Sequence, residues 1–250
     1  AMESAGTFNR IQAIMLLQPE KQMYKFLHRY FVSAVIDEAE LERYYKLSFL
    51  GMTFDQISNH EPETEYFDDM LASLSMADVY HTDAKRDAFN LLLRLNIDED
   101  IKLGRKFDFN VWNKRSLEHI YSKSKVWHTD ESGKVFDGND RELHGGLRAI
   151  TKDPTFMPRD RIVNRDGTRL SEHCIGNLVL LYGENNARFG NAGFEQKKMM
   201  FLAPGDMTVF ESRNLLHSVC IFAGNSWNHQ SIVDNYNLTL KNLKQYYGYK

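Results

Sequence analysis

The sequence predicts an α+β fold in which a helical bundle comes first, a small unit containing strands follows, and a helical tail ends the chain. Apolar residues recur at helical spacing through the first hundred residues. After about residue 99 the chain becomes richer in Gly, Asn, Asp and Pro, and short alternating stretches appear. Hydrophobic residues make up 42% of the 250 residues, which excludes a largely disordered chain and allows a substantial core.

The first part, residues 1–105, is predicted to form the helical bundle. Apolar stripes indicate helices over residues 8–17, 23–31, 38–50, 67–74 and 89–95. Thr53 is an expected N-terminal cap, and so is either Thr82 or Asp83. Core packing between helices explains these stripes, so we assign no chemistry to them.

The second part, residues 106–250, is predicted to contain the strands. Residues 107–109 alternate as a strand does, residues 178–181 suit a buried strand, and a hairpin is expected from residues 126–128 and 134–136. The stretch 125–170 is longer than an ordinary loop and is interpreted as an insertion. Helices are expected over residues 194–202, ending at Pro204 and Gly205, and near the end of the tail, within residues 214–247.

Charge and cysteine content restrict the class of protein. Two cysteines, Cys174 and Cys220, are too few for a disulfide framework, so a reducing cytoplasm is expected. No apolar run reaches the roughly 20 residues of a membrane-spanning helix, and no membrane partner is expected. The net charge of -3 does not favour nucleic-acid binding, but basic residues cluster around the motifs described next, as a bound phosphate backbone requires.

Two segments contain the groups that phosphodiester hydrolysis requires. The first contains Glu118 and His119, and the second runs from Asn177 through an apolar stretch to Asn186. A neutral imidazole can take a proton from water. A carboxylate and a carboxamide can hold a divalent cation that stabilises negative charge, while a second carboxamide positions the histidine. Each group is common alone, but together the two segments supply one group for each of these roles.

In these segments the chain resembles the HNH domain in the C-terminal half of GmrSD-type modification-dependent restriction endonucleases. The shared pattern is an acidic residue followed by His and Ile, then Gly-Asn-Leu-x-Leu-Leu, an Asn-rich turn and a Phe-x-x-Lys-Lys helix. It covers residues 107–202, and the preceding helices and the tail with Trp227 also fit. The resemblance implies a ββα-metal (HNH) unit within residues 106–250 that hydrolyses DNA with a divalent metal, Mg²⁺ or Mn²⁺, in defence against phage or modified DNA.

The resemblance also gives each matching residue a role. His119 matches the general base, Asn177 the residue that braces the loop and the histidine, and Glu118 and Asn186 the metal ligands. The expected nucleic-acid contacts are Lys197 and Lys198, which match the helix lysines of the family, and Arg188 and Lys123, which flank the motifs.

Several expectations test this alignment. His119 and Asn177 are expected on adjacent strands of one hairpin, with Asn186 on the following helix and facing them. Asn185 and Asn191 are rivals of Asn186 for the ligand role, and a shift of one residue on a helix turns a side chain by about 100°. The chain has Glu118 where the family often has Asp, and Ser122 where it often has Pro.

Two other functions remain open at this stage. One alternative to a DNA endonuclease is a catalytically decayed HNH module for nucleic-acid binding or assembly. The other is an HNH ribonuclease. The family's NTPase and sensor domain is not in this sequence, so the chain is expected to be a fragment or a stand-alone relative with such a domain or subunit as partner. Five scattered histidines lack the spacing of a zinc site: His128, His144, His173, His217 and His229. The sequence leaves open which DNA sequence or modification is recognised, whether one or both strands are cut, and the oligomeric state.

Overall fold

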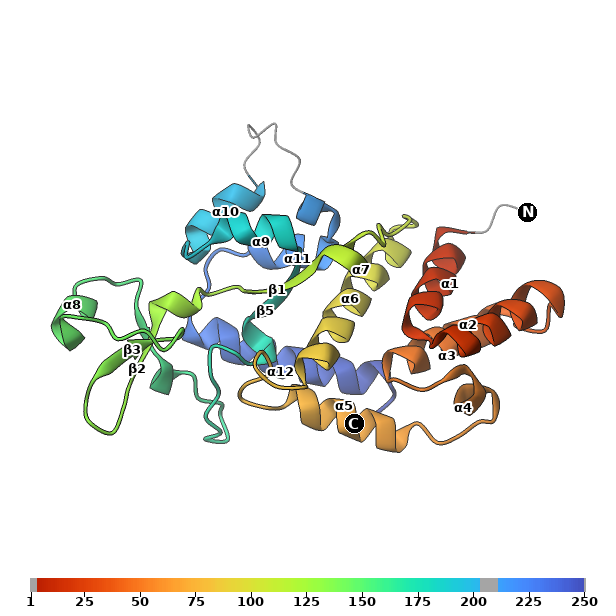
Figure 1. Cartoon of the computed structure of the whole chain (residues 1–250), viewed down its shortest axis with the longest axis horizontal. Coiled ribbons are helices and arrows are strands. Elements are labelled where there is room, and N and C mark those ends of the chain that lie inside the picture. Colours follow the sequence, from red (N-terminus) through yellow and green to blue (C-terminus); the bar gives the residue numbers. More distant parts are fainter. Residues whose placement is uncertain (1–3, 203–210, 250) are drawn as a thin grey trace.

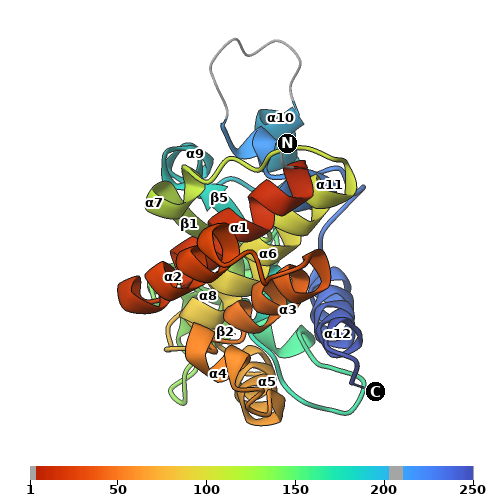
Figure 2. The ribbon, with the colours of Figure 1, turned by 90° about the vertical axis from the view of Figure 1, so that its right-hand side faces the viewer.

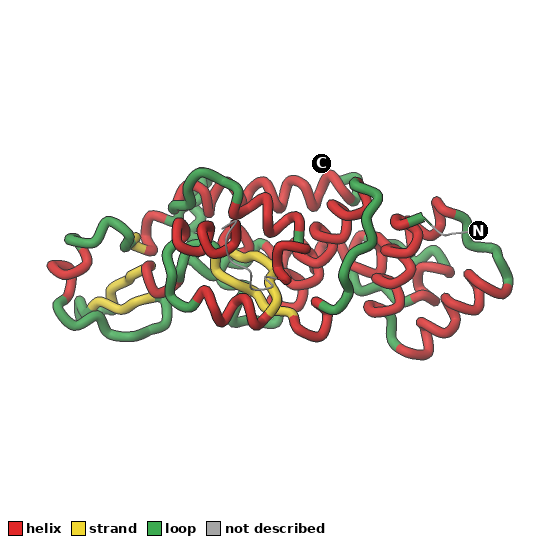
Figure 3. The backbone as a smooth tube through the Cα atoms, turned by 90° about the horizontal axis from the view of Figure 1, so that it is seen from above, coloured by secondary structure: helices red, strands yellow, loops and turns green. Residues whose placement is uncertain are grey.

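The computed structural model describes residues 4–202 and 211–249, and it confirms the α+β class. Helices dominate, and the strands form one two-stranded and one three-stranded sheet within these residues. The molecule is elongated (Figures 1 and 3). The first helices lie at one end, a small hairpin lies at the other, and the two-stranded sheet lies between them.

The first part is helical, as predicted. Its elements are α1 (Ala5–Leu17), α2 (Glu20–Leu27), the π-helix η1 (His28–Val32), α3 (Glu38–Phe49), α4 (Phe54–Ser58), α5 (Thr64–Leu74) and α6 (Lys85–Lys102). Thr53 is confirmed as a cap, because it forms a reciprocal capping box with Gln56 at the start of α4. The predicted cap of α6 is wrong: Ala84 precedes the helix and no side chain caps it.

The second part alternates short strands and helices. Its elements are α7 (Val111–Lys114), β1 (Arg115–His119), η2 (Lys123–Lys125), β2 (Val126–Thr129), β3 (Val135–Asp137), α8 (Gly146–Ile150), β4 (Met157–Pro158), η3 (Arg159–Arg161), η4 (Ile175–Asn177), β5 (Leu178–Tyr182), α9 (Gly183–Phe189), α10 (Phe194–Leu202), η5 (Glu211–Asn214), α11 (Leu216–Phe222) and α12 (His229–Tyr246). The hairpin, the buried strand and the helix over 194–202 are confirmed. Residues 107–109 are not a strand, and the predicted stop at Pro204 and Gly205 lies outside the described residues.

The two-stranded sheet joins segments that are far apart in the sequence. Strand β1 pairs antiparallel with β5, with Arg115 opposite Tyr182 and His119 opposite Leu178. All five residues of β5 are buried, because both faces of the strand are covered. Its alternate residues Leu178, Leu180 and Tyr182 belong to the main core with the helices of the first part. Val179 and Leu181 face a second, smaller core that includes aromatic residues of α9, α10 and α11.

Helix α12 supports the turn that precedes β5. A Cβ atom added at Gly176 would lie 2.2 Å from the carbonyl oxygen of Ile232 on α12, so only glycine permits this close approach. Asn235 of the same helix donates a hydrogen bond to the Gly176 oxygen at 2.9 Å. The end view shows α12 running beside the helices of the first part (Figure 2). Helix α12, which is not part of the sheet, therefore fixes the position of the turn before β5.

None of the described helices is both long enough and apolar enough to cross a membrane. Cys174 is buried and Cys220 is exposed, and both are free thiols.

Candidate active site

Asn177 ties the end of β1 to the start of β5. Its side-chain oxygen accepts a hydrogen bond from the Tyr121 backbone N–H at 2.8 Å, and its Nδ2 donates to the Tyr121 and Glu172 carbonyl oxygens at 3.0 and 2.9 Å. Its own carbonyl oxygen accepts from the Ile120 N–H at 2.8 Å. Asn177 itself lies in the turn η4 and not on a strand. These four bonds fix the chain that leaves His119.

His119 ends β1 and is almost completely buried, with 3% of its surface exposed. Its Nε2 shares a hydrogen bond of 3.0 Å with Nδ1 of His173. The Tyr80 ring packs against it with ring centroids 4.5 Å apart. Burial, and then the nearby His173, holds the pKa of His119 well below its usual range, so the imidazole is neutral at neutral pH.

The carboxylate of Glu172 lies next to the other ring nitrogen of His173. Nε2 of His173 lies 3.4 Å from Oε1 of Glu172, whose side chain is fully buried. Arg159 binds this carboxylate through two nitrogens, with Nε 2.8 Å from Oε2 and Nη2 2.6 Å from Oε1. The order Arg159, Glu172, His173, His119 therefore forms a chain of polar contacts that ends at the expected base.

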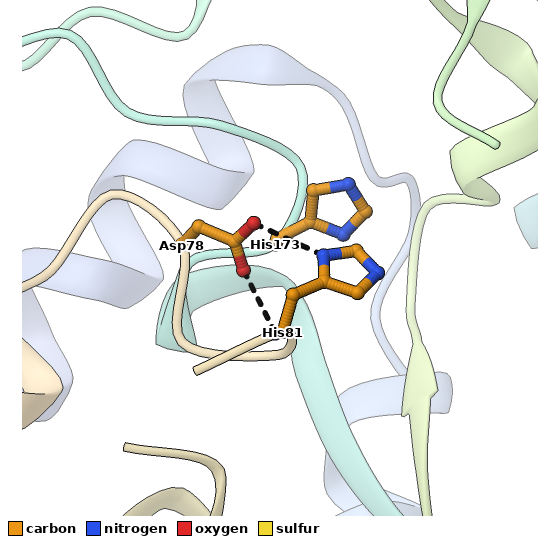
Figure 4. Close-up of side chains that lie close together, drawn as sticks. All are labelled: Asp78, His81 and His173. Atoms are coloured by element: carbon orange, nitrogen blue, oxygen red, sulfur yellow. Dashed lines mark hydrogen bonds and ion pairs between the residues drawn. The ribbon is translucent and has the colours of Figure 1, made fainter. Parts of the chain in front are cut away.

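The loop between α5 and α6 brings two further ligand-type side chains to this place. Asp78 and His81 lie with His173 in a cluster whose ligand atoms are all within 4.8 Å of one another, and the three side chains face one another (Figure 4). Asp78 accepts from the His81 backbone N–H at 3.0 Å, and its Oδ2 is 3.0 Å from His81 Nδ1. The Val79 N–H donates to the His173 oxygen at 3.0 Å, which docks the loop on the segment before η4.

Glu118 faces the opposite side of β1 from His119, because successive side chains of a strand alternate. It is 8% exposed, and its Oε1 accepts a hydrogen bond of 2.5 Å from Lys197 of α10. Lys197 is fully buried and also donates to the His119 carbonyl oxygen at 2.6 Å. Burial raises the pKa of Glu118 and lowers that of Lys197, while their mutual attraction opposes both shifts.

Asn186 and Asn185 point in different directions from α9. Asn186 donates through Nδ2 to the Ser116 hydroxyl at 2.5 Å, so it lies on the Glu118 side of β1. Asn185 is buried, and its oxygen accepts from the backbone N–H and the hydroxyl of Ser212 at 2.8 and 2.7 Å. Asn186 therefore shares a face of β1 with Glu118, whereas Asn185 faces the core. The remaining rival, Asn191, is exposed beyond the end of α9.

The four expected nucleic-acid contacts have different surroundings. Lys197 is enclosed, as described above. Lys198 is half-buried and donates to the Gly224 carbonyl oxygen at 2.7 Å. Arg188 is exposed on α9, and the ammonium group of Lys123 lies 5.3 Å from the centre of the Tyr80 ring, close to His119. Other basic residues of the region form ion pairs, such as Lys125 with Asp153 at 2.9 Å.

The sequence prediction missed the neighbours of His119. In the sequence, His173 is one of the histidines that lack the spacing of a zinc site, and Asp78 and His81 lie in the part predicted to be a helical bundle without chemistry. About 95 residues separate Asp78 from His173, so no local motif connects them. The position of His173 four residues before Asn177, in the turn that enters β5, was the available signal.

Comparison with known proteins supports the resemblance found in the sequence. The family model described as GmrSD restriction endonucleases, C-terminal domain, matches residues 64–240. No curated protein and no solved structure shows a significant match to the chain.

Proposed function

The chain belongs to the family of C-terminal domains of GmrSD restriction endonucleases, and we propose that it is an HNH-type, metal-dependent endonuclease that hydrolyses phosphodiester bonds of DNA. The same proposal places the protein in a cytoplasmic restriction system that acts against phage or modified DNA. It also includes an NTPase or sensor domain or subunit as partner. The observation that carries it is the arrangement of His119 and Asn177. Two segments 58 residues apart meet as antiparallel strands, and Asn177 fixes the chain next to a buried, neutral histidine.

His119 is proposed to take the proton of the attacking water. For this it needs a free lone pair, which requires Nε2 to carry the proton and to donate to Nδ1 of His173, leaving Nδ1 of His119 as the accepting atom. His173 then carries its own proton on Nε2, on the side of the Glu172 carboxylate. The buried negative charge favours this tautomer and stabilises the imidazolium that forms on His119. His173 and Glu172 are thus positioning residues.

Glu118 and Asn186 are proposed to hold the divalent cation. The donor set fits a hard cation such as Mg²⁺ or Mn²⁺, because a carboxylate and an amide oxygen are hard ligands and both side chains lie on the same face of β1. A cation there supplies stabilisation of the negative charge that develops on the phosphate and the leaving oxygen. Lys197 already neutralises much of the Glu118 charge, so the affinity for metal is expected to be weak.

The alternation of side chains at the end of β1 suits an in-line displacement. The base His119 lies on one face of the strand, and Glu118 lies on the other. Attack and departure occur on opposite sides of the phosphorus, so a phosphate at the strand end would have the base on its attacking side. Because His119 is 3% exposed, substrate binding must displace a neighbour, and the half-buried Tyr80 covers its ring.

Cleavage assays on plasmid DNA and on a structured RNA test the proposal. The full chain is incubated with each substrate in Mg²⁺, in Mn²⁺ and in EDTA. Cleavage of DNA that requires the cation supports the proposal. Preference for RNA would replace it with a ribonuclease, and binding without cleavage of either substrate would replace it with a decayed module, a reading that the Lys197–Glu118 ion pair favours.

A further inference from the structure

We propose that Asp78, His81 and His173 bind a divalent transition-metal ion of the zinc class, and that this ion breaks the hydrogen bond between His173 and His119. This site is separate from the one proposed at Glu118 and Asn186. Its effect on cleavage rests on the proposed role of His119, but binding of the ion does not.

The geometry is close to that of a metal site. Oδ2 of Asp78 and Nδ1 of His81 are 3.0 Å apart. Two ligands of a tetrahedral zinc ion, each at about 2.0–2.1 Å from it, lie about 3.3 Å apart. All three ligand atoms are within 4.8 Å, so a modest closure completes the set. The His81 side chain is 51% exposed and can supply that movement.

The donor types select the class of metal. Two imidazole nitrogens and one carboxylate oxygen are the ligands of zinc sites that keep one position open for water or another group. Mg²⁺ prefers oxygen ligands alone, and therefore does not compete effectively for this cluster. The two proposed sites are thus distinguished by the chemistry of their ligands.

One nitrogen atom connects the cluster to the base. In Figure 4, Nδ1 of His173 is the ring nitrogen directed toward His81, and the same atom forms the 3.0 Å hydrogen bond with Nε2 of His119. Its single lone pair can bind a metal ion or accept a proton from His119, but not both. A bound ion therefore removes the acceptor that holds His119 in the tautomer with a free Nδ1.

The same loop carries the ring that covers His119. Tyr80 lies between Asp78 and His81 in the sequence, and its ring centroid is 4.5 Å from that of His119. An ion held by residues on both sides of Tyr80 keeps this ring in place. Both effects act in one direction: an ion of the zinc class inhibits cleavage.

Metal binding is measured directly on the full chain with Co²⁺, whose visible absorption becomes strong in a tetrahedral site, and by calorimetry with Zn²⁺. The wild type is compared with His81→Ala and Asp78→Asn, with His144→Ala as the matched control, since His144 is an exposed histidine outside the cluster. We expect one site in the wild type and the control. Both cluster variants should bind more than about tenfold more weakly, because even indirect changes around a metal cost about 10–100-fold.

Cleavage of plasmid DNA in excess Mg²⁺ with added Zn²⁺ tests the coupling. Zn²⁺ should inhibit the wild type and His144→Ala, and His81→Ala should be resistant. Equal binding by the wild type and His81→Ala overturns the site, and binding without inhibition of an active enzyme overturns the coupling. If the protein cleaves nothing in Mg²⁺ or Mn²⁺, the proposed function fails while the Co²⁺ and Zn²⁺ titrations still decide the site.

Discussion

Lys197 places a positive charge inside the protein, beside Glu118. The sequence suggested a phosphate contact at this position, but the ammonium group is fully buried and bonded to Glu118 and to the His119 carbonyl oxygen. A lysine in this position holds the end of β1 in place through its bonds to Glu118 and to the His119 carbonyl oxygen. Its removal therefore has consequences for stability that a surface lysine would not have.

Replacement of Lys197 by Met should lower the free energy of unfolding by about 3–5 kcal/mol, because it leaves the Glu118 carboxylate buried without a partner. The matched control Lys198→Met removes one bond to the Gly224 oxygen and should cost about 1 kcal/mol. Urea unfolding at pH 7 measures both. If Lys197→Met leaves stability unchanged but weakens DNA binding, the phosphate role is correct and the buried ion pair is not structural.

Glu172 is expected to set the tautomer of His119 through His173. The variant Glu172→Gln keeps the size of the side chain but removes its negative charge, so the preference for a proton on His119 Nε2 should weaken. Nitrogen NMR of the imidazole rings measures this directly, and the cleavage rate should fall by less than the about 10²–10⁴-fold expected for loss of a base. An unchanged His119 tautomer in this variant would remove Glu172 from the account.

At the scale of elements, helix α9 directs two adjacent asparagines to different places: Asn186 toward β1, as a proposed metal ligand, and Asn185 toward Ser212, as a structural residue. Asn186→Ala should abolish metal-dependent cleavage with little loss of stability, because the amide is half-buried and its hydrogen bonds within residues 4–202 and 211–249 go to β1. Asn185→Ala should retain the activity per folded molecule but lower the free energy of unfolding by about 1–3 kcal/mol, since Ser212 loses its buried partner. Activity and thermal unfolding of the two variants are measured together, and a reversed pattern would shift the alignment by one residue.

How much of the fold was predictable differs between elements. The apolar periodicities predicted most of the helices, the hairpin and β5, because burial dictates those patterns locally. Residues 107–109 alternate but form no strand, since the Phe107 N–H donates to the side chain of Asn9 on α1 and the Asp108 side chain accepts from the Asn110 N–H. For the site, the motif predicted that His119 and Asn177 lie close together, as the pairing of β1 with β5 shows, and their roles stay predictions. The Asp78 loop was not predictable, because its docking on the segment before η4 depends on tertiary contacts alone.

At the scale of the whole molecule, one core connects the bundle to the strands. The main cluster contains residues of the first part, such as Phe89 and Leu92, together with Leu180 of β5 and Val233 of α12. The helical bundle and the second part, which the sequence analysis divides at residue 105, therefore share one hydrophobic core. Substitutions in the first part can affect the site through this packing.

His217 lies on α11, which packs against α6, and it should make stability depend on pH. Burial lowers its pKa to about 4, whereas the unfolded chain binds that proton at about 6.5. The unfolded state binds more protons between these values, so stability is lost as the pH falls from about 6.5 to about 4. In His217→Gln, the fall in unfolding free energy between pH 7 and pH 5 should be smaller than in the wild type. An equal fall in both proteins would show that other groups cause it.

The central claim is that His119 is the base of a metal-dependent nuclease, and its most direct test is the single-turnover rate of plasmid DNA cleavage by His119→Ala in Mg²⁺. The account predicts a loss of about 10²–10⁴-fold or more in the rate of the folded variant relative to the wild type, with DNA binding nearly unchanged, and no loss in the control His144→Ala. Because His119 is buried and bonded to His173, the variant should also be less stable, so the rate is measured where thermal unfolding shows it to be folded. A His119→Ala variant that cleaves DNA at the wild-type rate would contradict the account.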